Sequence, residues 1–215
     1  MNEIAPIVPA SGDKEATMPR KEPTQRRSKE RVERILSCAS TLIAQGGSDA
    51  MRMSDVAEMA EISIGSLYQY FPDKGSIIRT LAERYNALGR DCIADALQNV
   101  SDMNGLQASF AELIDVYYAM FLAEPVMRDI WSGTQADKAL RDIDLHDSRL
   151  NGAVLADARS RINPAADRAA LENSSFLIMQ LGEATMRLAI SVDRAEGDAL
   201  VKNFKRMVLR EMLVG

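Results

Sequence analysis

Aromatic residues are scarce in this chain of 215 residues, at 5% of the total, and alternating runs of β-branched residues are absent. Alanine, leucine, isoleucine and methionine are plentiful instead. Such a composition argues against a sheet-based fold and predicts an all-α protein.

The chain also lacks a run of 18 apolar residues, and its first residues lack the charged start and apolar core of a secretory signal. We therefore expect neither a membrane span nor a membrane partner. The two cysteines, Cys38 and Cys92, stand singly without metal-type spacing. This spacing favours buried, reduced thiols and hence a cytoplasmic location.

Sequence motifs of enzymes are missing too. His146 is the sole histidine and lies in a charged stretch, so we expect it on the surface. No glycine-rich phosphate loop, nucleophile elbow or paired metal-ligand motif occurs. We expect no catalytic residue, no metal site and no cofactor, and thus no enzyme.

Charge is unevenly distributed along the chain, although the net charge is −5. Residues 18–34 contain seven basic and three acidic residues, whereas residues 81–215 contain 15 basic and 20 acidic ones. A basic leading arm on an acidic body is a polarity that a DNA-docking protein can use. An ordinary solvated face explains the same pattern.

The stretch from Met53 to Lys74 predicts two short helices joined by a tight turn. Ser63 stands where the second helix needs an N-cap, and Leu67 and Phe71 form its buried side. The other side carries hydroxyl and amide groups that suit DNA phosphates and base edges. The alternative is a small amphipathic helix pair of the kind found in any helical domain.

The run ISIGSLYQYFPDK, from Ile62 to Lys74, resembles the recognition segment of the TetR family of bacterial transcription regulators. The resemblance covers about residues 31–81 by motif and implies a three-helix DNA-binding domain with a helix-turn-helix. Carried onto this chain, it implies DNA contacts from Ser54, Ser63, Ile64, Gly65, Ser66, Tyr68, Gln69, Tyr70 and Lys74.

Two residues depart from the family pattern. Glu61 stands where the family usually has a turn glycine, a position that often needs positive φ. Arg52 stands where a threonine usually caps the first of the two helices, so Ser54 is an alternative cap with a later helix start.

Apolar spacing and caps predict about nine helices in two domains. Residues 1–22 are expected to be a disordered tail, 23–73 the helix-turn-helix domain, and 74–215 a helical effector-binding and dimerisation domain. Expected boundaries include a first helix ending at Gly46-Gly47, a fourth from Lys74 to a point between Asp102 and Gly105, a sixth from Pro125 to Gly133, a seventh capped by Thr134, an eighth opened by Asn163-Pro164 and a ninth capped by Asp193.

The expected eighth and ninth helices are apolar nearly all round, so each needs cover on both sides. A second copy of the chain is the natural cover, and the family resemblance likewise implies a homodimer through these two helices. A fully internal helix in a monomer is the alternative.

A pocket for a small, mostly apolar effector is implied in the second domain by the same resemblance. The aromatic residues Tyr117, Phe121, Trp131 and Phe176 are candidate walls, although such stripes also form ordinary cores. Polar residues at i, i+3 and i+7 interrupt the apolar eighth helix and face either this pocket or the dimer seam: Gln180, Glu183 and Arg187.

Together these features predict a ligand-responsive repressor that binds a palindromic, double-stranded DNA operator as a dimer. Two rival functions stay open. The helices could form a small-molecule carrier or enzyme, or a protein-interaction module, in either case without specific DNA binding.

Overall fold

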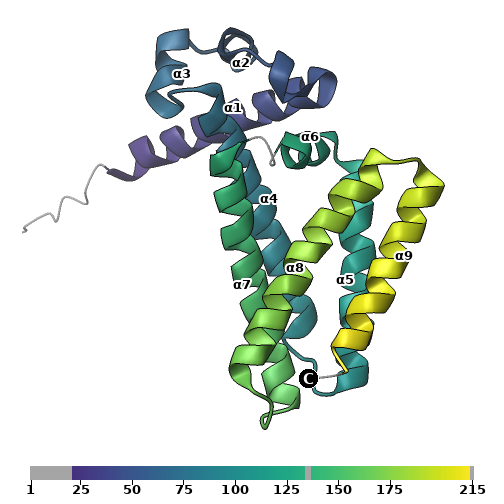
Figure 1. Ribbon diagram of the computed structural model, residues 1–215. Helices are drawn as coiled ribbons and strands as arrows, with labels where there is room; N and C mark the ends of the chain where they lie inside the picture. Colours follow the sequence, from purple (N-terminus) through teal and green to yellow (C-terminus); the bar gives the residue numbers. More distant parts are fainter. Residues whose placement is uncertain (1–20, 134–136, 214–215) are drawn as a thin grey trace, which may run out of the picture.

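The computed structural model describes residues 21–133 and 137–213, with side chains from residue 25 onward. Within these ranges the chain folds into helices without a strand (Figure 1), which confirms the predicted all-α class. Of the predicted tail at residues 1–22, residues 1–20 lie outside the described part, whereas residues 21 and 22 belong to the first helix and not to a disordered tail. The helices are α1 (Lys21–Ala50), α2 (Met53–Met59), α3 (Ile64–Tyr70), α4 (Lys74–Leu97), α5 (Met103–Ala123), α6 (Pro125–Gly133), α7 (Lys138–Ile162), α8 (Arg168–Ser191) and α9 (Arg194–Glu211).

Helices α1 to α3 form one end of the molecule (Figure 1). Ile35, Leu36 and Ile43 of α1 are buried in the same apolar cluster as Val56 of α2 and Leu67 of α3. The predicted stop at the double glycine is a break rather than an end, because Gly47 leaves helical geometry at φ 80° and ψ 161° before the helix resumes to Ala50. Apolar burial on one side of each short helix thus holds this end together.

The structure shows the consequences of the two residues that depart from the family pattern, Glu61 in the turn between α2 and α3 and Arg52 before α2. Glu61 adopts φ 53°, the conformation that glycine would take at lower cost. Arg52 occupies the N-cap position of α2 but its side chain makes no capping hydrogen bond. The alternative cap is wrong, because Ser54 lies inside the helix and donates to Asp55 at 3.0 Å.

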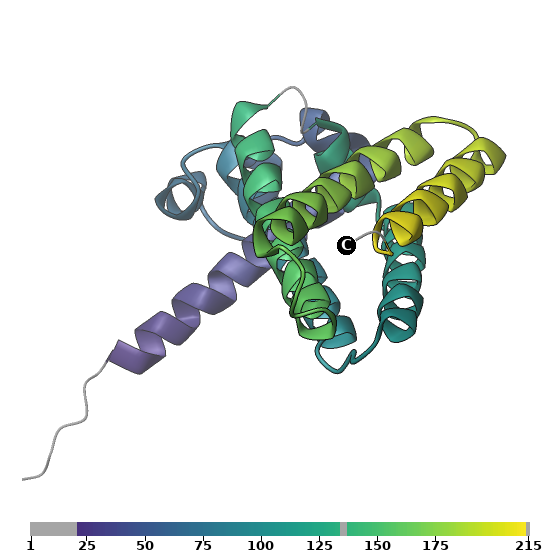
Figure 2. The ribbon, with the colours of Figure 1, turned by 60° about the horizontal axis from the view of Figure 1, so that its bottom comes forward.

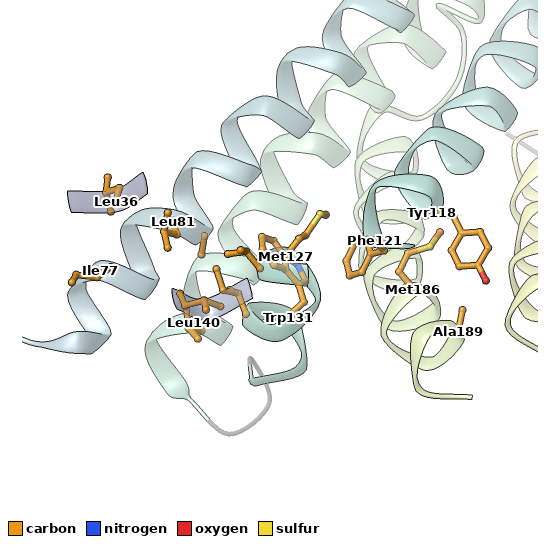
Figure 3. Close-up of a cluster of buried hydrophobic side chains, with 14 of the residues drawn as sticks. Leu36, Ile77, Leu81, Tyr118, Phe121, Met127, Trp131, Leu140, Met186 and Ala189 are labelled. Carbon is orange, nitrogen blue, oxygen red and sulfur yellow. The ribbon is translucent and has the colours of Figure 1, made fainter. Parts of the chain in front are cut away.

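Helix α4 connects the α1–α3 end to the rest of the molecule (Figure 1). The Asp73 carboxylate accepts from the Ser76 backbone at 2.6 Å in a reciprocal capping box. Ile77 and Leu81 lie beside Leu36 of α1 (Figure 3), so the start of α4 is packed against the first helix. The helix ends at Leu97, earlier than the predicted end near residues 102–105.

Helices α5 and α7 to α9 extend to the other end, where α7 packs on α8 and α5 on α9 (Figure 2), whereas α6 lies against α1 (Figure 1). A side chain at Gly152 of α7 would meet the Phe176 backbone at 2.8 Å, so glycine is required for the close approach of these helices.

Two predicted helix starts in this region are wrong. Helix α7 begins after a cap at Asp137, and Thr134 lies outside the described residues. Helix α8 begins after a cap at Asp167, because Asn163 and Pro164 belong to the preceding turn. The predicted cap of α9 at Asp193 is confirmed, since its carboxylate accepts from the Glu196 backbone at 3.1 Å.

The outer faces of α8 and α9 differ, which corrects the expectation that both are apolar all round. Helix α8 exposes Leu177, Leu181, Ala184 and Leu188 along one stripe. The outer face of α9 is largely polar, because its apolar residues turn inward against α5 and α8. Its exposed residues include Lys202, Asn203, Arg206 and Arg210 beside Met207, whereas Val201, Phe204 and Val208 are buried.

Three remaining expectations concern single residues and membrane spans. His146 is exposed as predicted, whereas Cys92 is exposed rather than buried and Cys38 is half-buried. No helix within the described ranges is long and apolar enough to cross a bilayer.

Candidate functional site

Helix α3 presents an exposed face opposite its buried one. Leu67 is fully buried, whereas the Tyr68 side chain next to it is 50% exposed and Ile64 is 44% exposed. Gln69 is exposed as well. A Cβ added at Gly65 would meet nothing within 4 Å, so this side of the helix is open to an approaching surface.

The predicted serines of this surface have mixed environments. Ser54 and Ser63 are exposed, and the Ser63 hydroxyl accepts from the Ser66 backbone at 3.1 Å, as an N-cap should. Ser66 is half-buried, and Tyr70 packs partly against the core. Tyr68 and Gln69 are therefore the side chains that reach outward most freely.

Lys74 occupies a different position from a freely solvated lysine. Its ammonium donates to the backbone carbonyls of Ser48 at 2.9 Å and Asp49 at 3.1 Å. An ammonium has three donors, so one remains for another partner. Lys74 thus ties the start of α4 to the end of α1, a contact that the sequence pattern did not indicate.

A cavity of about 90 Å³ lies among helices α4 to α9. Of the predicted effector-binding residues, it brings together Tyr117, Trp131 and Glu183. Most of its wall is apolar, as is usual for a small-molecule pocket. The apolar side chains that line it include Ile93, Phe110, Leu113, Ile114, Met120, Met127, Ile178, Met179 and Met186.

Four predicted effector-binding residues do not line this cavity. Phe121 lies behind its wall, fully buried, with its ring edge-on to those of Tyr117 and Trp131 at centroid distances of 5.0 and 6.1 Å. The backbone of Phe176 is pressed against α7, and its ring lies 4.3 Å from the Arg149 guanidinium. Close helix packing therefore removes Phe176 from the pocket.

The other two belong to the polar stripe of α8. Gln180 donates to the Ser148 hydroxyl of α7 at 2.7 Å, and Ser148 lines the cavity. Arg187 has its Nη1 atom 3.9 Å from both the Glu183 and the Asp144 carboxylates. The partners of the stripe lie on α5, α6, α7 and α8 of the same chain, so it faces inward, opposite the exposed leucines of that helix.

Glu183 is an acid of the cavity wall with a shifted pKa. The Tyr117 hydroxyl donates to its Oε1 atom. Burial, and then the nearby Asp144 carboxylate, raise the pKa of Glu183 to about 7, although Tyr117, Arg187 and Trp131 act in the opposite direction. Glu183 can therefore gain or lose a proton near neutral pH.

The sequence pattern did not identify a second polar group on the cavity wall. It comprises Asn86 of α4 and Asp147, Ser148 and Asn151 of α7, all buried. The signal was present in α7, where polar residues at 147, 148 and 151 continue the face that carries Leu140 and Leu155. Polar residues on a buried helix face usually have specific partners.

Helix α6 links the cavity to the α1–α3 end. Met127 and Trp131 of this helix line the cavity, and Asp129 between them accepts from the Ser48 backbone at 3.0 Å. The carbonyl of the same Ser48 accepts from Lys74 at 2.9 Å. One continuous set of contacts therefore joins the cavity wall, the end of α1 and the start of α4.

Metal binding finds no support in the described ranges, which contain no group of three or more His, Cys, Asp or Glu side chains that could hold an ion. Two features of the described residues have functional geometry: the exposed face of α3 and the mostly apolar cavity among α4 to α9.

Comparison with known proteins gives two family matches. Residues 35–81 match the model of bacterial regulatory proteins of the tetR family, and residues 104–214 match the tetracycline repressor-like C-terminal domain. The chain is 48% identical over 46 residues to the HTH-type transcriptional repressor KstR of Rhodococcus jostii, a match that covers 21% of this chain and 22% of the relative. The matches to KstR proteins span 22% to 28% of the relatives' length.

Solved structures share the fold over most of the chain. A TetR-family transcriptional regulator from Streptomyces coelicolor superposes with a TM-score of 0.62 at 24% identity, covering 85% of this chain and 97% of that one. The complex of RolR with resorcinol gives a TM-score of 0.62 at 18% identity, covering 87% and 95%. At these identities the likeness concerns the fold alone.

Proposed function

Since this chain belongs to the TetR family of bacterial regulatory proteins, we propose that it is a transcriptional repressor that binds a DNA operator and responds to a small molecule. The observation that carries this proposal is the exposed face of α3, where Tyr68 and Gln69 project from a helix whose opposite side is fully buried. A helix with one anchored and one open side can enter the major groove.

The exposed stripe of α8 supports a dimer. Leu177, Leu181 and Leu188 are 56%, 43% and 51% exposed, an unusual arrangement for a surface helix. Pairing two copies there would hold two α3 helices in place for successive grooves, about 34–36 Å apart on a palindromic operator. The exposed leucine stripe of α8 needs a partner surface, whereas the polar outer face of α9 would lie at most at the edge of the dimer interface.

The cavity supports a response to an effector. RolR, a protein of the same fold, has been solved with resorcinol, a small and mostly apolar ligand. In this chain an occupant would touch Met127 and Trp131, and the Asp129 contact would transmit a shift of α6 to Ser48 and Lys74. A changed spacing of the α3 pair then lowers DNA affinity through a population shift between two dimer states.

Cytoplasmic DNA is the partner that this function requires, and catalysis plays no part in it. The rival functions are a helical carrier or enzyme built around the cavity, and an interaction module that docks a foreign protein on α8. Neither rival accounts for the open face of α3.

DNA binding is the decisive test. We expect the full chain to shift DNA taken from upstream of its own gene, and to bind it more tightly than a scrambled duplex of equal length and charge. Gel-shift titration at two salt concentrations separates the specific from the charge-driven part. Equal affinity for both duplexes would contradict an operator and favour the rival functions.

Dimerisation has its own test. Ala184 is exposed between the α8 leucines, so Ala184→Asp should bring like charges together at the seam and shift the dimer toward monomers while leaving the fold intact. Asn203→Asp adds the same charge on the polar face of α9 and serves as the control. Sedimentation velocity reports both, and an unchanged dimer in Ala184→Asp would contradict the α8 seam.

A further inference from the structure

The polar atoms of the cavity wall carry information about its occupant. A pocket of about 90 Å³ has room for roughly six to nine water molecules, and so for a small molecule only. Its apolar walls supply contact area but do not fix the orientation of a bound molecule. Orientation and selectivity therefore depend on the buried polar groups that lack a partner in the protein.

Asn151 has one such atom. Its side chain is buried, and its amide nitrogen donates to the Asp147 Oδ2 atom at 2.9 Å, while Arg90 donates to the other oxygen of Asp147. A carboxylate can only accept, so the amide orientation of Asn151 is fixed. The Oδ1 atom is left without a hydrogen-bond partner among the described residues.

Glu183 has the second polar atom that lacks a partner within the described ranges. Its Oε1 atom accepts from Tyr117, whereas Oε2 is buried without a hydrogen-bond partner in the described part of the chain. The Arg187 guanidinium, whose Nη1 atom is also buried without a hydrogen-bond partner among the described residues, stands 3.9 Å from Oε2, beyond hydrogen-bonding distance, and is shared with Asp144. It balances charge near Glu183 without satisfying its lone pairs.

Asn151 Oδ1 and, in the ionised form of Glu183, Oε2 are hydrogen-bond acceptors, and leaving a buried acceptor unpaired costs about 1–3 kcal/mol. A hydroxyl also fits the protonated form, because its oxygen can accept the carboxyl proton. We propose that the cavity binds a small, neutral, apolar molecule that carries hydroxyl donors, which pair with Asn151 Oδ1 and Glu183 Oε2. This inference rests on the proposed function, because it assigns the chemical class of the effector.

Charged ligands fit the wall less well. A carboxylate would meet the carboxylates of Glu183 and Asp147, and the nearby Arg90 already pairs with Asp147. An ammonium would lose its hydration in a mostly apolar cavity beside Arg187. A hydroxyl satisfies an acceptor without bringing a charge.

Four related phenethyl compounds separate these classes: tyrosol with two hydroxyls, its dimethyl ether without a donor and larger by two methyl groups, tyramine with an ammonium, and 4-hydroxyphenylacetate with a carboxylate. Calorimetric titration of the full chain should show tyrosol binding roughly a hundredfold tighter than its dimethyl ether, since two hydrogen bonds to buried acceptors are lost and each weakens binding by about tenfold. Tighter binding of the ether or the carboxylate than of tyrosol, or no tyrosol binding at millimolar concentration, would overturn the proposal.

Variants of the cavity wall show which side chains cause the difference in affinity between tyrosol and its ether. Asn151→Leu should reduce tyrosol affinity about tenfold and leave the ether unchanged. Glu183→Gln keeps an oxygen for Tyr117 and turns an NH₂ group toward the former Oε2 position, so it should weaken tyrosol and strengthen the ether. Cys92→Ala, on the same wall but without an open acceptor there, is the control and should change neither. Unaltered selectivity in Glu183→Gln, which preserves side-chain shape, would overturn the assignment even if Asn151→Leu failed to fold.

A DNA-binding assay distinguishes a failure of the effector proposal from a failure of the repressor proposal. Fluorescence anisotropy with labelled operator should show release of DNA by tyrosol and not by its ether. A chain that binds operator but ignores tyrosol refutes the effector class and leaves the repressor function standing. A chain that binds tyrosol selectively but no operator retains the hydroxyl site and refutes the repressor.

Discussion

The exposed face of α3 and the cavity differ in how far apart in the sequence their residues lie. The α3 face is made by residues 63–70, within one short helix and its cap. The cavity draws on residues from Tyr85 to Phe204, contributed by six helices. A site made by consecutive residues depends on local helix geometry, whereas a site made by distant residues depends on how the helices pack. Substitutions should therefore affect fold stability strongly around the cavity and weakly on α3.

The largest effect is expected where an apolar residue of α9 faces the core. Val208 is 4% exposed, whereas its neighbour Met207 is 62% exposed. Val208→Asp should lower the free energy of unfolding by about 3–5 kcal/mol, because it buries a charge without a partner. Met207→Asp is the matched control and should melt near the wild-type temperature. Similar melting of the two variants would contradict the orientation of α9.

The next effect concerns Glu183 and pH. Its folded-state pKa of about 7 exceeds the ordinary 4.5, so between these values the folded chain holds a proton that the unfolded chain has released. The contribution of this group to stability is therefore full below pH 4.5 and is lost as pH rises toward 7.

Glu183→Gln mimics the protonated form and should remove that loss. We expect the variant to gain roughly 1–3 kcal/mol over wild type at pH 8 and little at pH 4.5, measured by urea unfolding. Glu112→Gln, an exposed position on α5, is the control. A gain that is independent of pH would show that Glu183 is ionised in the folded state throughout this range.

A smaller effect on stability, but a clear one on DNA, is expected at α3. Tyr68 is half exposed, so Tyr68→Ala should leave the melting temperature nearly unchanged and weaken operator binding roughly tenfold, equivalent to about 1.4 kcal/mol. Gln69→Ala should alter sequence preference more than affinity, because its amide can read a base. Glu83→Ala, exposed on α4, is the control. Wild-type affinity in Tyr68→Ala would remove this side chain from the DNA contact.

The smallest effect is expected at Lys74, which belongs to both kinds of site. Lys74→Ala should lower stability by about 1 kcal/mol, because two hydrogen bonds to the end of α1 are lost on a partly exposed side chain. If its remaining donor meets a phosphate, the logarithmic salt slope of DNA binding should fall by about 1. Lys138→Ala, exposed at the start of α7, is the control. A lowered melting temperature with an unchanged slope would leave Lys74 a purely structural role.

Local features of the sequence determined the helical class, the α2–α3 turn and several caps. Ser63, Asp73 and Asp193 cap their helices because a short polar side chain can reach the free backbone amides three residues on, whatever the rest of the chain does. Glu61 takes a positive φ because the turn between two short helices requires it.

Tertiary packing decided which apolar residues face solvent and which polar residues face the cavity. Phe176 and Trp131 are both aromatic residues on apolar helix faces, yet the close approach of α7 and α8 at Gly152 excludes one from the cavity, and the position of α6 places the other in its wall. Asn151 gained its open acceptor only through Asp147 and Arg90, the latter on another helix. Side-chain periodicity fixes which residues share a face of one helix, but the partner of that face is set by contacts between distant segments, which no local pattern encodes.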